Sequence, residues 1–171
     1  MADWSQTQDF EVLMDPRSES SVADLEAQFE LVLKARDKVT ETHDAVRAIH
    51  AIRAEVDAAW EKSQTANNIT SARLAEVISA IRTEIDDLED HLRQKRATVW
   101  QDTANFEPLI DDQFAWLASY TLSAETRPTD SALERYNDLE QQLAVYLDRL
   151  DTIQREDVSL LRSLMQEWEH Q

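Results

Sequence analysis

Four histidines are the residues of this chain best suited by type to metal binding or proton transfer: His43, His50, His91 and His170. His43 and His50 lie seven residues apart, so on a helix they face the same way, two turns apart. Zinc ligands on one helix are usually four residues apart, so this spacing argues against a shared metal. We expect both, together with Arg36, to flank an apolar helix seam as polar residues that set register and partner choice rather than catalyse.

Carboxylates are abundant, but their spacing does not match a catalytic pair. Di-iron bundles need two Glu-x-x-His pairs, whereas the single pair here is Glu167 with His170, near the C-terminal end. Consecutive carboxylates on a helix point in different directions, so we interpret three acidic pairs as solvated faces: Asp86-Asp87, Glu89-Asp90 and Asp111-Asp112. The chain has no cysteine and no glycine, which removes thiolate nucleophiles and glycine-rich phosphate loops. We therefore expect no catalytic, cofactor-binding or metal site, and no enzyme.

The chain is strongly acidic, with 35 Asp and Glu residues against 17 Lys and Arg and a net charge of -18. Such a surface repels a phosphate backbone, so we expect no nucleic-acid partner. Only four of the basic residues are lysines, which favours a halophilic source in which salt screens the self-repulsion. The alternative is an acidic adaptor or nucleic-acid mimic that binds a basic protein, and carboxylates concentrated on one face would favour it.

The absence of glycine predicts a mostly helical chain, because tight hairpins and left-handed turns depend on its freedom at positive φ. The apolar periodicity indicates an all-α fold, an elongated antiparallel hairpin or bundle of about four helices over residues 22–63, 71–100, 108–122 and 130–168. Ser21 and Asp24 are expected to cap the first helix, and Asn67-Asn68 to form the turn after it. Residues 22–171 would form a single domain.

The second predicted helix carries a series of residues, all apolar except Lys95, in alternating steps of four and three, which is typical of a coiled-coil seam. These residues are Leu74, Ile78, Ile81, Ile85, Leu88, Leu92, Lys95 and Val99. Exposed seam ends would permit self-association, so a homo-oligomer is expected. In the last helix the pattern leaves open whether Gln154-Arg155 breaks the helix or only bends it.

Aromatic residues cluster around the second break in the helical pattern: Trp100, Phe106, Phe114, Trp116 and Tyr120. We interpret the cluster as a hydrophobic lock at one end of the bundle. Trp116, Trp100 and Tyr120 are the candidates for contact with another domain, because aromatic residues left on a surface often mark an interface.

Residues 1–21 differ from the rest of the chain. Phe10, Val12 and Met14 follow a period of two that stops at Pro16, which predicts either a disordered leader or the last strand of a preceding domain. The first residues lack the features of a signal peptide, and no stretch approaches the ~20 apolar residues that span a membrane. We expect a soluble chain with no membrane partner, in a compartment that the sequence leaves open.

Six stretches carry a resemblance to a known family: Phe10–Arg17, Ser21–Phe29, Arg36–Val46, Leu109–Leu117, Ala124–Thr129 and Tyr136–Leu139. Together they resemble the C-terminal region of large bacterial β-propeller proteins with BNR or sortilin-type repeats, which are usually described as glycosyl hydrolases. In that family a signal peptide and propellers precede a helical tail, so Phe10–Arg17 would be the exit from the last propeller.

This chain contains none of the propeller repeats, so no catalytic residue can be transferred from the family. The resemblance implies a non-catalytic accessory domain, a spacer or assembly module of an exported protein. Its expected partner is a protein, either the propeller itself or a second copy of the chain, and no cofactor is implied.

Overall fold

The computed structural model describes residues 4–64 and 69–170. Its elements are α1 (Val22–Ser63), α2 (Ile69–Leu92), the 3-10 turn η1 (Trp100–Ala104), α3 (Ile110–Thr121), α4 (Asp130–Thr152), the π-helical turn η2 (Ile153–Asp157) and α5 (Val158–Glu169). The described residues contain no β-strand. The predicted all-α fold is confirmed, and α4, η2 and α5 together form the single long helix expected over residues 130–168.

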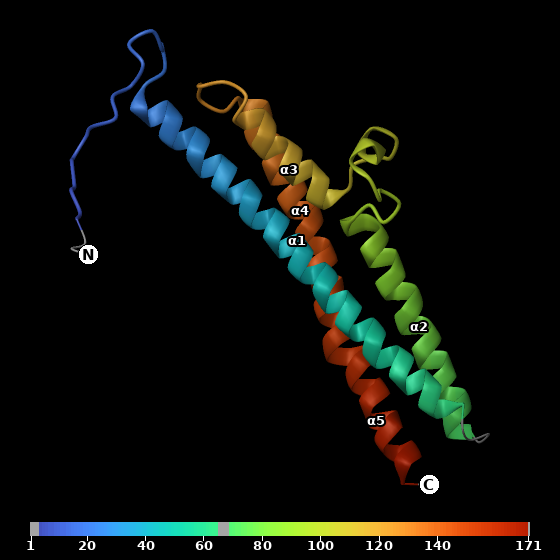
Figure 1. Ribbon diagram of the computed structural model, residues 1–171. Coiled ribbons are helices and arrows are strands. Elements are labelled where there is room, and N and C mark those ends of the chain that lie inside the picture. The colour runs from blue at the N-terminus through green and yellow to red at the C-terminus, as the bar shows by residue number, and fades with distance from the viewer. Residues whose placement is uncertain (1–3, 65–68, 171) are drawn as a thin grey trace.

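The helices form three columns, of which α1 is the longest (Figure 1). With 42 residues, α1 is about 63 Å long at 1.5 Å per residue. The second column returns along α1 as two helices in succession, with α2 against one half of α1 and α3 against the other. The third column contacts α3 through α4 and contacts α2 mainly through α5. The fold is therefore an elongated bundle that includes the predicted antiparallel hairpin of the first two helices.

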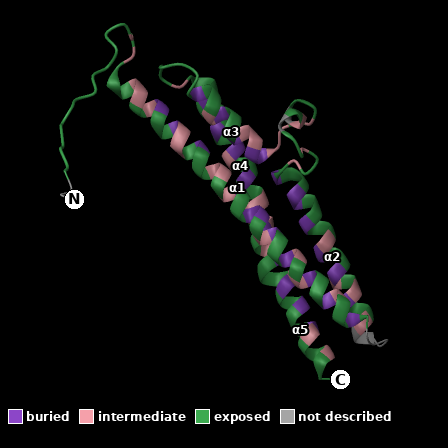
Figure 2. Cartoon of the chain, viewed as in Figure 1, coloured by how far each residue is buried: buried purple, intermediate pink, exposed green. Residues whose placement is uncertain are grey.

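One continuous hydrophobic core runs along the axis between these columns (Figure 2). The predicted seam of α2 lies inside it up to Leu92, because six of its members are at most 1% exposed: Leu74, Ile78, Ile81, Ile85, Leu88 and Leu92. These side chains are already covered by helices of the same chain. Self-association would therefore need a different surface.

The helix ends follow local capping chemistry. The backbone N–H of Asp24 donates to Ser21 Oγ at 3.2 Å, and the N–H of Ser21 donates to the Asp24 carboxylate at 3.1 Å, which is the predicted cap of α1. Thr129 caps α4 in the same way through the N–H of Ala132. The predicted turn at Asn67-Asn68 lies outside the described residues.

The predicted end of the second helix at residue 100 is wrong, because α2 ends at Leu92. After it, the Asp102 carboxylate accepts hydrogen bonds from the backbone N–H groups of Thr98 at 2.9 Å and Val99 at 3.1 Å. Such local bonds compete with helix formation, and here they begin η1 instead. Lys95 and Val99 thus leave the seam, and the chain between residues 93 and 109 turns so that α3 continues the second column.

The sequence pattern left open whether the helix breaks or bends at Gln154-Arg155. In the structure the helix continues there through the π turn η2. The N–H of Val158 donates to the carbonyl of Ile153, five residues earlier. Both residues are buried, at 3% exposed each. On either side of η2 the core residues are spaced three or four residues apart, whereas Ile153 and Val158 are five residues apart. A π turn accommodates the one extra residue. The π turn keeps both halves of the column facing the core.

Residues 4–20 form an irregular leader that ends at α1. Its apolar side chains lie in solvent: Trp4, Phe10, Val12 and Leu13 are between 76% and 86% exposed. Only its last residues contact the bundle, where Ser20 Oγ donates to the carbonyl of Glu125 in the α3–α4 loop. No helix in the described part of the chain is long and apolar enough to cross a membrane.

Candidate interaction surface

Two of the polar residues predicted along the first helix, His43 and His50, contact neighbouring helices. His50 Nε2 lies 2.8 Å from Oε1 of Glu89 on α2, and Arg53 donates to the other carboxylate oxygen at 2.8 Å. Arg53 also donates to Asp86 at 2.6 Å. Glu89 is 3% exposed, so its carboxylate is buried between the two helices and satisfied by α1. This cluster fixes the register of the hairpin.

The pKa of Glu89 depends on its burial and on its contacts with His50 and Arg53. Burial raises the pKa of this carboxyl, but the hydrogen bonds from His50 and Arg53 and the Arg53 charge outweigh burial, so the pKa lies below its ordinary value. The ionised form is therefore the stable one in the folded chain. The cluster is an ion pair between α1 and α2.

His43 makes the equivalent contact with α3. Its Nε2 lies 3.3 Å from the carboxylate of Asp111, which is 9% exposed. Asp111 also accepts the N–H of Asp112 at 2.8 Å in the first turn of α3. Burial and the neighbouring charge of Asp111 raise the pKa of Asp112, and the nearby His43 partly offsets them. His43 and His50 thus flank the packed face of α1, and each bonds to a different helix.

The other end of α3 is held by Gln28 of α1. Its buried side-chain amide donates to the carbonyl of Thr121 at 2.6 Å and to the carbonyl of Ala124. These carbonyls lie at the C-terminal end of α3, where the last turn lacks helical partners. Polar contacts from α1 therefore fix both ends of α3.

Arg36 lies outside the seam. Its side chain is 61% exposed and pairs with the adjacent Asp37 at 2.6 Å, while the neighbouring Ala35 is fully buried. The packed face of α1 passes through Ala35, one residue away from the predicted position. The predicted role of Arg36 as a polar seam residue has no contact in the structure to support it.

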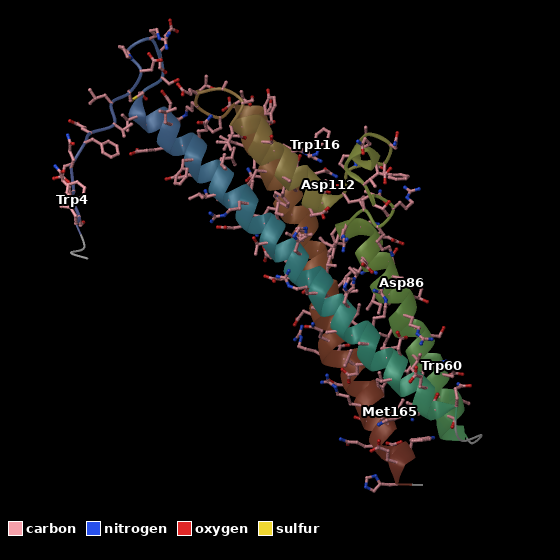
Figure 3. All side chains as sticks on the ribbon, in the orientation of Figure 1. Trp4, Trp60, Asp86, Asp112, Trp116 and Met165 are labelled. Atoms are coloured by element: carbon pink, nitrogen blue, oxygen red, sulfur yellow. The ribbon has the colours of Figure 1, made fainter. Side chains whose placement is uncertain are left out.

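Two exposed aromatic residues lie one turn apart on α3, beside Arg135 of α4. Trp116 is 60% exposed and Tyr120, one turn later, is 67% exposed. With Pro108 and Leu117 they line an open depression of about 470 Å³, whose polar rim is formed by Glu107, Gln113 and Arg135. Trp116 projects from α3 on the side away from α1 (Figure 3). We call these seven residues the α3–α4 aromatic surface.

The predicted aromatic lock divides into two parts. Phe114 is fully buried, with its ring edge toward Tyr136 at 5.9 Å between centroids. Phe106 lies beneath the guanidinium of Arg96 at 4.6 Å. Trp116 and Tyr120 face solvent instead, and the side chain of Trp100 lies outside the described part of the structure. Two of the three predicted contact residues therefore share one exposed surface.

A further apolar depression, of about 320 Å³, lies between α1 and α5. Ala58, Leu161 and Met165 line it, and the ion pair of Arg162 with Glu55 at 2.7 Å lies at its edge. It has no exposed aromatic side chain in its lining. The α3–α4 aromatic surface is therefore the better candidate for a protein contact.

Reasoning from sequence missed Glu89, Asp111 and Gln28, each of which is buried and bonded to another helix or loop. Glu89 and Asp111 belong to acidic pairs that were interpreted as solvated. The histidines gave no usable signal, because the side chains of His43 and His50 are 46% and 49% exposed and do not require a protein partner.

The described residues contain no group of three or more His, Cys, Asp or Glu side chains placed to hold a metal ion. Comparison of the chain with protein-family models, with curated proteins and with solved structures found no match.

Proposed function

We propose that this chain is a non-catalytic helical interaction module, in which a rigid bundle presents the α3–α4 aromatic surface to a protein partner. The observation that carries the proposal is the exposure of Trp116 and Tyr120, at 60% and 67%, on a helix whose two ends are fixed to α1. Large aromatic side chains supply much of the binding free energy at interfaces, and a rigid support lowers the entropy cost of binding.

The elongated shape supports a spacer role as well. The α3–α4 aromatic surface lies in the half of the bundle nearest the leader, and the length of α1, about 63 Å, separates that half from the end formed by α2 and α5. The resemblance to the C-terminal region of propeller proteins supports a place beside a β-propeller domain in an exported protein. In that setting the chain positions the propeller or assembles copies of it, and it takes no part in hydrolysis.

The alternative role of acidic adaptor is less favoured, because carboxylates occur on every long helix. Exposed examples are Glu26 and Glu61 on α1, Glu76 on α2, Asp138 on α4 and Glu167 on α5. A mimic of nucleic acid needs them concentrated on one face. Their presence on α1, α2, α4 and α5 favours adaptation of the surface to salt instead.

Light scattering in high salt tests the assembly role. We expect an average mass that rises with protein concentration, because salt screens the repulsion between acidic copies and leaves the aromatic contact intact. A strict monomer that also fails to bind a β-propeller domain of the resembled family would contradict the proposal.

A further inference from the structure

We draw no further inference here: the strongest candidate, the exposed apolar side chains of Phe10, Val12 and Leu13 on the leader, carries none because nothing in the described part of the chain shows what covers them.

Discussion

At the scale of single residues, the buried carboxylate of Glu89 decides how α1 and α2 are held. It accepts hydrogen bonds from Arg53 and His50 while it is 3% exposed, so its neutralisation weakens two contacts between α1 and α2, although Arg53 keeps its bond to Asp86. We expect Glu89→Gln to lower the free energy of unfolding by about 1 to 3 kcal/mol, the usual range for hydrogen bonds to a charged group. Urea unfolding measures this change.

Glu76→Gln is the matched control, because Glu76 is an exposed carboxylate on the same helix. Its substitution is expected to change the free energy of unfolding by less than about 0.5 kcal/mol. Equal effects of the two substitutions would show that the Glu89 cluster has no special role in stability.

The lowered pKa of Glu89 predicts a dependence of stability on pH. A carboxyl whose pKa is depressed by folding stabilises the chain above its unfolded value and loses that contribution as pH falls through its folded value. The ordinary value for this group is 4.5. The difference in unfolding free energy between the wild type and Glu89→Gln should therefore be constant above pH 4.5 and shrink below it. A difference that grows on acidification would contradict the assignment.

The residues that flank the core were only partly predictable from sequence. His43 and His50 were expected to flank a packed seam, and in the structure their side chains are 46% and 49% exposed and contact Asp111 and Glu89. Glu89 and Asp111 could not be distinguished from Asp86 or Asp90, because burial of a carboxylate depends on which helix faces it. That information is not contained in local spacing.

At the scale of elements, η2 preserves the register of the third column. Deleting Arg155, an exposed residue of η2, would shorten the step between Ile153 and Val158 from five residues to four, which an ordinary α-helix accommodates. We therefore expect this deletion to leave the fold intact and to cost less than about 1.5 kcal/mol, as for a tolerated surface change. Circular dichroism and urea unfolding measure the outcome.

Deleting Asp148 in α4 is the control, since Asp148 is also exposed but lies within regular α-helix. This deletion turns every later core residue by one helical position, about 100°, and should destabilise the bundle strongly. If the Arg155 deletion is as damaging as the Asp148 deletion, η2 has a role beyond register.

The elements themselves were largely predictable. The seam of α2 and the cap at Ser21 depend on local spacing and local bonds, which the sequence contains directly. The end of α2 at Leu92 was not predicted, because the periodic spacing continues to Val99. In the structure the Asp102 carboxylate accepts hydrogen bonds from the backbone of Thr98 and Val99, and η1 begins there instead. Periodicity alone does not reveal such a competing bond.

At the scale of the whole molecule, the net charge of -18 predicts that salt stabilises the fold. Added salt shortens the range of repulsion between carboxylates spread over all helices. We expect the thermal unfolding midpoint to rise steadily with sodium chloride, as measured by circular dichroism. A midpoint that falls would mean that the surface ion pairs contribute more than the general repulsion costs.

The central claim is that the α3–α4 aromatic surface is an interface, and the most direct test is the self-association of two variants. Trp116→Ala and Phe29→Ala each remove an aromatic side chain that is 60% exposed, but only Trp116 belongs to this surface. Sedimentation equilibrium in high salt should give at least about a tenfold weaker association for Trp116→Ala, as expected for an interface aromatic whose loss costs more than about 1.4 kcal/mol. Phe29→Ala should associate like the wild type. Equal association of all three proteins would contradict the account.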